Sequence, residues 1–274
     1  MGNSKQVIGY ENEWENFFKR HPEWPIIYNS LITMTKSIFL RKIDISNLAD
    51  KTVFSIGRLC VEDFNEIFLL CGNSYGFGAL KLIRGLYERT VTMSFIAKNP
   101  DEAKAFRNFH YVQTRKTLSH AKDLIRDNDE IKKKIEEVEK SYQKHKDDFT
   151  EFVCEKCKKT RIRFSWSKLD LASMARKVDL DRLYYFGYAF PTLQTHATHS
   201  SILERMKITE DDSISFDESL QPEWADTALI TAHDILINVF IVQNAYFNLK
   251  LDSEIELRKN EFIKFWKKQN KKTD

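Results

Sequence analysis

The chain contains few residues of the kind that terminate secondary structure. It has eight Gly and five Pro among 274 residues, whereas an all-β chain of this length needs many more turn residues. With 42% apolar and 30% charged residues, the composition is that of a globular protein and excludes extensive disorder. No domain boundary stands out. The sequence therefore predicts an all-α protein that forms a single helical domain over residues 1–274.

Apolar residues recur at helical spacing along almost the whole chain. Pro191 interrupts one helical segment, and Thr192 is suited to cap the helix after the break. We expect residues 154–164 to be irregular and basic, and residues 209–220 to form an exposed acidic linker. The sequence also predicts a basic C-terminal helix and tail over residues 254–274. These segments favour an up-and-down helical bundle, with helices predicted over residues 11–20, 24–41, 46–71, 77–98, 100–126, 130–152, 169–177, 181–205, 222–249 and 254–269.

The most polar helical segment, residues 130–152, carries a seam of apolar residues in steps of three and four. Such a seam is typical of a coiled coil. With the preceding helix it predicts a long charged hairpin, residues 101–152, projecting from the bundle. The helix over 129–152 is then a candidate for docking a partner protein or for self-association into a homodimer. The seam residues are Ile131, Ile135, Val138, Tyr142, Phe149 and Phe152.

Charge and motif content exclude several classes of protein. The net charge of +3, from 43 basic and 40 acidic residues, gives no global affinity for polyanions. Four Cys are too few for a disulfide scaffold. Uninterrupted apolar runs are far shorter than the roughly 20 residues that span a bilayer, and the N-terminus lacks an apolar signal region. We expect a soluble cytoplasmic protein. Without a P-loop, a dinucleotide fingerprint, H-E-x-x-H or G-x-S-x-G, no cofactor is expected.

A charged pair lies among apolar residues of the helix predicted over 77–98. On a helical wheel Arg84 falls inside the apolar arc, and Glu88 lies one turn later at its edge. A buried Arg is costly unless paired, so the spacing predicts an Arg84–Glu88 ion pair. The pair is either part of an internal polar site or a structural link between helices. The arc consists of Phe77, Leu80, Ile83, Leu86, Tyr87, Val91, Met93 and Phe95.

Histidines at three places are candidates for chemistry. His110 lies at the centre of an apolar stripe on the next helix, where a core position is the usual explanation. Together with Arg84 and Glu88 it would instead permit acid–base chemistry on a phosphate ester, or anion binding. His196 and His199 are spaced to share one helical face. That face is either part of a functional site or a solvated or partly packed surface. His233 lies among apolar residues and is expected in the core.

Cys154 and Cys157 form a single C-x2-C pair. A structural zinc site needs four ligands, and His196 and His199 would complete a Cys2His2 set if the fold brought them there. The alternative is a pair of loop thiols beside a basic segment.

A basic cluster follows this pair and precedes Phe164 and Trp166. Basic residues near aromatic rings suit contacts with nucleic-acid phosphates and bases, although solvated surface charge explains many such clusters. Arg115 and His120 match R-x4-6-H, the signature of HEPN-type ribonucleases, but so short a pattern also arises by chance. The basic cluster consists of Lys156, Lys158, Lys159, Arg161 and Arg163.

Residues 76–117 contain Phe77-Gly78-Ala79, Arg84-x3-Glu88, Asn99-Pro100 and Phe109-His110. In these features the chain resembles a bacterial family catalogued as domain of unknown function family 5677, over about residues 45–250. That family tends to carry a later Ser-x3-His-x-Ser element, for which Thr195, His199 and Ser201 or Ser200 would correspond, with Thr195 departing from the pattern.

The resemblance implies a helical bundle, a bacterial cytoplasmic setting, and a polar cluster of Arg84, Glu88, His110 and His199. The bundle of the family is distantly similar to HEPN domains, many of which cleave RNA as dimers.

These observations lead to one expected function and two alternatives. We expect a nucleic-acid- or nucleotide-directed effector. The most specific version of this expectation is a metal-independent HEPN-like ribonuclease of stress or phage defence. Arg84, oriented by Glu88, would hold a phosphate, and His110 or His199 would move a proton. The alternatives are a non-catalytic interaction module and a small-molecule or nucleotide sensor, each with a buried Arg/Glu/His network.

Overall fold

Helices form most of the structure, a computed structural model that describes residues 12–42, 45–120, 129–154, 156–208, 213–216 and 221–270. The all-α prediction is confirmed. The helices of the bundle are α1 (Glu13–Arg20), α2 (Trp24–Phe39), α3 (Leu48–Gly72), α4 (Gly76–Lys98), α10 (Pro222–Phe247) and α11 (Asp252–Asn270).

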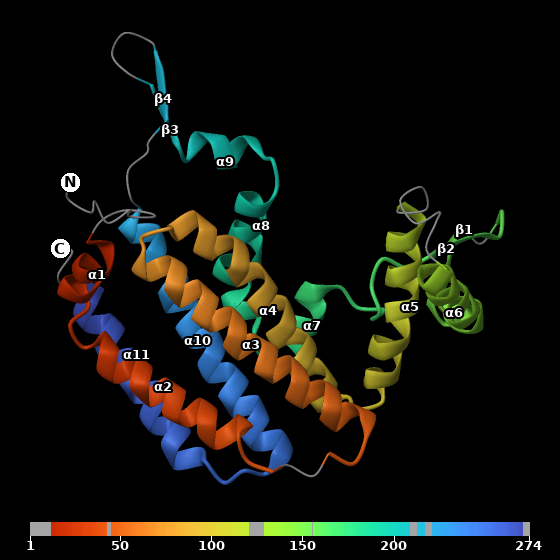
Figure 1. The fold of residues 1–274 in the computed structure, drawn as a ribbon, viewed down its shortest axis with the longest axis horizontal. Coiled ribbons are helices and arrows are strands. Elements are labelled where there is room, and N and C mark those ends of the chain that lie inside the picture. The colour runs from red at the N-terminus through yellow and green to blue at the C-terminus, as the bar shows by residue number, and fades with distance from the viewer. Residues whose placement is uncertain are drawn as a thin grey trace.

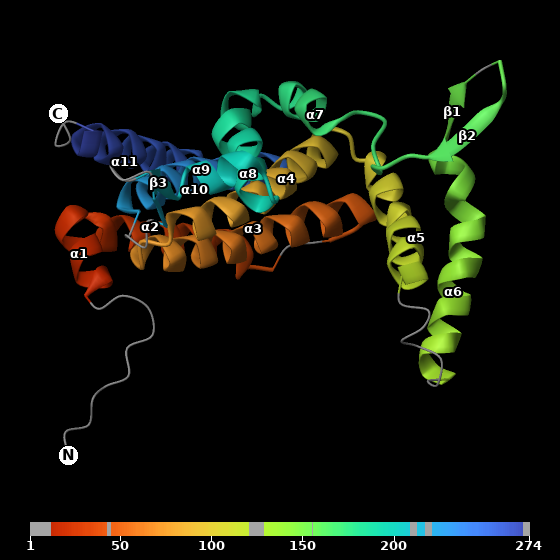
Figure 2. The same cartoon turned by 90° about the horizontal axis from the view of Figure 1, so that it is seen from above.

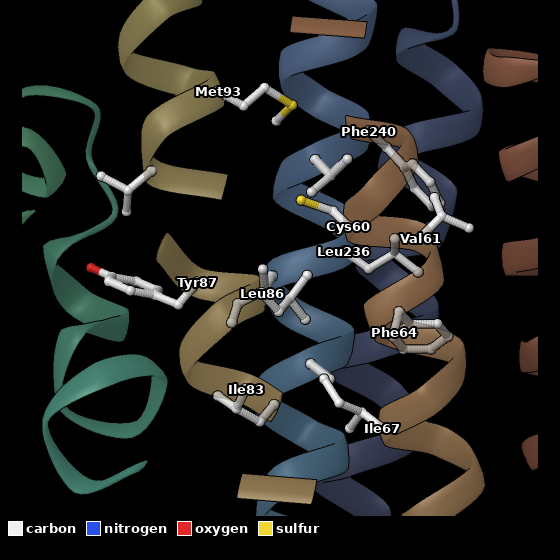
Figure 3. Packing of buried hydrophobic residues seen from close by; sticks show 14 of the residues in the cluster. Cys60, Val61, Phe64, Ile67, Ile83, Leu86, Tyr87, Met93, Leu236 and Phe240 are labelled. Atoms are coloured by element: carbon white, nitrogen blue, oxygen red, sulfur yellow. The ribbon is translucent and has the colours of Figure 1, made fainter. Parts of the chain in front are cut away.

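Helix α10 lies at the centre of the bundle and packs against α3 and α4, while α2 and α11 cover its other side (Figure 1). Figure 3 shows α3, α4 and α10 contributing apolar side chains to one core. The apolar arc predicted on α4, from Phe77 to Phe95, is buried. At Gly57 the backbone of α3 approaches α10 so closely that a Cβ would clash with the side-chain amide of Gln243.

Helix α10 is long and apolar enough to cross a membrane by length and composition alone. Sequence reasoning from uninterrupted apolar runs missed this. Most of its apolar window is buried inside the bundle, which is also typical of the core helix of a water-soluble fold.

An arm projects from the bundle, as predicted (Figures 1 and 2). It consists of α5 (Glu102–His120), α6 (Asp129–His145), the 3-10 helix η2 (Lys146–Phe149) and the antiparallel strands β1 (Thr150–Cys154) and β2 (Lys159–Ile162). Residues 121–126 of the helix expected over 100–126 lie outside the described residues.

The structure corrects the expected end of the arm in two respects. Helix α6 stops at His145 rather than continuing to residue 152. The segment expected to be irregular, residues 154–164, instead contains a turn at residues 156–158 and the second strand of a hairpin, β2. Phe149 leaves the predicted seam because its ring packs 5.1 Å from that of Phe109. Phe152 lies on β1 and is 69% exposed.

The segment before α10 also differs from expectation. After α7 (Leu171–Lys177) and η3 (Asp181–Leu183), a π-helix, η4 (Tyr185–Ala189), runs directly into α8 (Phe190–Thr195), so Pro191 interrupts nothing. The break falls between α8 and α9 (His199–Leu203), where Thr198 rather than Thr192 is the cap. Part of the expected acidic linker forms β4 (Ile214–Phe216), paired with β3 (Met206–Ile208).

Candidate functional site

The predicted Arg84–Glu88 ion pair is present on α4. Arg84 Nη2 lies 3.0 Å from Glu88 Oε1, with the two side chains 27% and 40% exposed. Arg84 Cζ also lies 5.2 Å from the ring centroid of Tyr188. A hydrogen bond with Tyr188 and the charge of Glu88 raise the pKa of Arg84, although partial burial opposes them. Arg84 is therefore a fixed cation at the contact between α4 and η4.

The π-helix η4 places Tyr188 over Arg84. Gly187 lies against the ring of Tyr87, and Tyr184 and Tyr188 both contact that ring. Tyr87 donates a hydrogen bond to the carbonyl of Leu180 at 2.9 Å, and burial raises its pKa. Isolated π-helical turns occur often at functional sites. No signal in the sequence marks this turn, because its hydrogen-bond pattern depends on packing against α4.

His110 is not the core residue that its stripe predicted. It lies exposed on α5, with its ring 3.3 Å from Thr114 Oγ1. Helix α5 leaves the bundle and packs against α3 and α6, so only the face carrying Ala103, Asn108 and Phe109 is buried. His110 instead lines a cavity of about 350 Å³ together with Phe106, Arg107 and Trp166.

His196 and His199 do not share a helical face, because α8 ends at Thr195 and α9 begins at His199. Both are exposed. Beside them the structure reveals a residue that the sequence did not indicate, Arg205. Its Cζ lies 3.8 Å from the ring centroid of Phe77, and its Nη1 donates to Gln194 Oε1 at 3.0 Å.

The four residues predicted to form a catalytic cluster are thus divided among three elements. Arg84 and Glu88 meet on α4, His110 lies on α5, and His199 lies on α9. Helices α5 and α9 are apart in both views (Figures 1 and 2). The catalytic roles of these residues stay predictions.

A second candidate site, which we call the arm groove, has a volume of about 430 Å³. Arg115 Nε lies 2.8 Å from Glu139 Oε2, and its Cζ lies 4.3 Å from the ring centroid of Tyr142. Arg163 Nη2 donates to the carbonyl of Asp148, whereas its Nη1 is buried without a partner among the described residues. The groove is lined by Phe109, Val112, Gln113, Arg115, Lys116, Ser119, Tyr142, Ile162, Arg163 and Phe164.

The predicted basic cluster divides between this groove and the hairpin. Arg163 lines the groove. Arg161 pairs with Glu151 at 2.6 Å and lies over the ring of Phe164. The three lysines of the cluster, Lys156, Lys158 and Lys159, are exposed, and the described part of the chain shows no ion pair for them.

The two cysteines of the C-x2-C pair lie at the end of the β1–β2 hairpin. The backbone N–H of Cys157 donates to Cys154 Sγ at 3.5 Å. Hydrogen bonds from the backbone and side chain of Cys157, and from the backbone of Lys156, lower the pKa of the Cys154 thiol. Burial raises the pKa of Cys60, in the core, to about 12.

Of the other predicted zinc ligands, His196 precedes α9 and His199 is its first residue. Helix α9 lies apart from the β1–β2 hairpin in both views (Figures 1 and 2). Among the described residues no group of three or more His, Cys, Asp or Glu side chains could hold a metal ion.

A further cavity, of about 590 Å³, lies between α4, α10 and the turn after α7. Sequence reasoning did not find it, because its lining comes from distant segments and is mostly apolar. The lining residues are Ser94, Ala97, Lys98, Val178, Asp179, Leu180, Asn238, Ile241, Val242, Ala245 and Tyr246.

Fold and sites together define a helical-bundle protein with a projecting, partly basic arm. The chain belongs to a family of unknown function, DUF5677, whose model matches residues 52–214. The matched range includes most of α3, all of α4, the whole arm and η4, so the candidate sites on α4, the arm and η4 lie within the family domain. No curated protein and no solved structure matches the chain.

Proposed function

We propose that this protein is an RNA-directed effector that holds single-stranded RNA in the arm groove. The observation that carries the proposal is the placement of Arg115, Lys116 and Arg163 in one groove with the rings of Tyr142 and Phe164. Proteins that bind single strands combine cations, which neutralise phosphates, with aromatic rings, on which bases stack.

Two details of the groove favour a ligand with phosphates and bases. The ring of Phe164 is 81% exposed and therefore accessible to a base that stacks on it. Arg163 adds a guanidinium group to the lining, a group that suits charge-assisted hydrogen bonds to phosphate oxygens. The exposed lysines of the hairpin extend the positive charge beyond the groove.

Cleavage of the bound RNA is the finer part of the proposal. Arg115, which lines the groove, and His120, which ends the same helix, form the R-x4-H pattern typical of HEPN ribonucleases. In this form His120 moves a proton and Arg115 stabilises charge on a phosphate, with no metal required. A cytoplasmic setting belongs to the proposal, since all four cysteines are free thiols.

Binding is tested by fluorescence anisotropy with a labelled single-stranded RNA of about 12 nucleotides. We expect Arg163→Ala and Lys116→Ala each to weaken binding by roughly fivefold to tenfold and to reduce the dependence of log K on log salt by about 0.7. Lys36→Ala, an exposed change on α2, is the matched control. Unchanged affinity in both groove variants would refute the proposed site.

Cleavage is tested with total cellular RNA, with and without chelator. Loss of cleavage in His120→Ala supports chemistry at the arm. Loss in Arg84→Ala or His199→Ala, with His120→Ala active, assigns the chemistry to the cluster predicted from the sequence. If the folded wild-type protein binds RNA but cleaves none, the protein binds without catalysis.

A specific observation favours one second candidate, a small-molecule sensor. The cavity of about 590 Å³ lies within the size range of ligand sites and is lined mainly by apolar residues. Ala245→Trp would fill it. A metabolite that raises the Tm of the wild type but not of this variant would support the sensor.

Docking of a partner protein through α6 has less support, because the predicted seam faces α5. Its residues Ile135 and Val138 line a small cavity together with Leu118 of α5.

A further inference from the structure

The turn between β1 and β2 brings two sulfur atoms together at the end of the hairpin. Cys154 ends β1 and pairs with Lys159 across the hairpin. The N–H of Cys157 points at Cys154 Sγ, at 3.5 Å, and Lys158 has a φ of 51°, in the left-handed region that a tight turn requires. Amide donors directed at a sulfur stabilise its thiolate form, as they do around metal-bound cysteines.

The described residues of one chain supply two zinc ligands at this turn, Cys154 and Cys157. Structural zinc takes four ligands, whereas no group of three or more candidate ligands exists among the described residues. Cys60 and Cys71 are fully buried in the bundle and cannot reach the turn. For a four-ligand site built on this turn, another molecule is the source of the two remaining ligands that the described residues do not supply.

The position of the hairpin permits a second copy to supply them. The β1–β2 hairpin lies at the end of the molecule away from the bundle in both views (Figures 1 and 2). Cys157 and the neighbouring lysines are exposed. Two hairpins related by a two-fold axis can therefore meet through the same surface, which is the usual geometry of a homodimer.

We propose that two copies of the chain bind one Zn²⁺ between their arms, with Cys154 and Cys157 of each copy as the four ligands. As the four Zn–S bonds form, the four thiols release their protons to solvent. A zinc ion with four thiolates is negatively charged, and Lys156, Lys158 and Lys159 of each copy offset that charge. Without the metal the same lysines repel one another, so association depends on zinc.

The test uses the full chain, reduced and stripped of metal, with metal content and light-scattering mass measured as Zn²⁺ is added. We expect one zinc per two chains and a doubling of the 32.4 kDa mass. Cys154→Ser and Cys157→Ser should each abolish both effects while circular dichroism stays unchanged. Substitution by Co²⁺ should give the absorption of a tetrathiolate site. The matched control, His196→Ala combined with His199→Ala, should bind and dimerise as the wild type does.

Several outcomes would overturn the proposal: one zinc per monomer, zinc uptake retained in Cys157→Ser, uptake lost in the histidine double variant, or a reduced chain that takes up no zinc. The last outcome would instead favour a redox role for the two thiols. The inference is independent of the proposed RNA binding, whose groove residues are not ligands. Either proposal can fail without the other.

Discussion

The indole Nε1 of Trp266 donates a hydrogen bond to Nδ1 of His233 at 3.3 Å, which joins α11 to α10 inside the bundle. His233 is 1% exposed and lies against the rings of Trp24 and Phe262. Accepting this bond requires an unprotonated Nδ1. Burial lowers the pKa of His233 from its ordinary value of about 6.5 to about 3.

This depressed pKa predicts that stability falls in mild acid. Between pH 6.5 and pH 3 the unfolded chain binds a proton at His233 and the folded chain does not, so the free energy of unfolding decreases as the pH is lowered. We expect a loss of about 2 kcal/mol between pH 7 and pH 5 from this group. Urea unfolding at both pH values measures it. His233→Gln, which keeps an acceptor for Trp266, should show a smaller difference, and an equal difference would contradict the assignment.

Gly187→Ala should destabilise the π-helix η4. A Cβ at this position would lie 2.6 Å from Cδ2 of Tyr87, a ring fixed by its hydrogen bond to Leu180. Overpacking of this kind costs about 1–3 kcal/mol. The matched control is Gly85→Ala, whose Cβ would meet only Arg89 Nη1 at 3.7 Å and which should be neutral or stabilising by up to about 1 kcal/mol. Thermal unfolding compares the two, and equal Tm values would refute the close contact.

Arg84→Ala should leave the protein folded. The ion pair with Glu88 is partly exposed and the cation–π contact with Tyr188 contributes little energy. We therefore expect the free energy of unfolding to fall by about 1 kcal/mol or less. Lys81→Ala, an exposed change on the same helix, is the control and should be near neutral. Denaturant unfolding gives both values. A loss above about 3 kcal/mol would instead identify Arg84 as part of a structural network.

Arg115→Ala should loosen the arm without affecting the bundle. Arg115 links α5 to α6 through Glu139 and Tyr142, and no residue of α6 is buried. A decrease of about 1 kcal/mol in the free energy of local opening of the arm should speed amide exchange in α6 by roughly fivefold. Lys134→Ala removes only a pair within α6, with Glu130, and should have a smaller effect. Equal protection in the wild type and Arg115→Ala would show that other contacts hold the arm.

Much of the fold was predictable because it depends on local periodicity. The scarcity of Gly and Pro, the apolar arc of α4 and the polar character of α6 correctly indicated a helical bundle with a projecting arm. The i,i+4 spacing was enough to predict the Arg84–Glu88 pair, since four residues along a helix bring two side chains to the same face. His233 was correctly expected in the core for the same reason.

Features that depend on contacts between distant segments could not be predicted in this way. His110 has an apolar stripe around it, but α5 leaves the bundle and the His110 side chain is exposed to solvent. The β1–β2 hairpin replaces the end of a predicted helix because Phe149 packs against Phe109, a contact across 40 positions of the chain. The π-helix over Arg84, the arm groove and the cavity beside α10 likewise exist only once the helices have packed.

By itself, then, the sequence determined which segments are helical and which local pairs form, because both depend on the spacing of residues along one helix. Only the tertiary structure decided which faces are buried, where Arg163, Tyr142 and Phe164 meet, and that Cys154 and Cys157 stand at the end of an arm. Those outcomes depend on how separate helices and strands pack against one another. The spacing of residues within a single element contains no information about that packing.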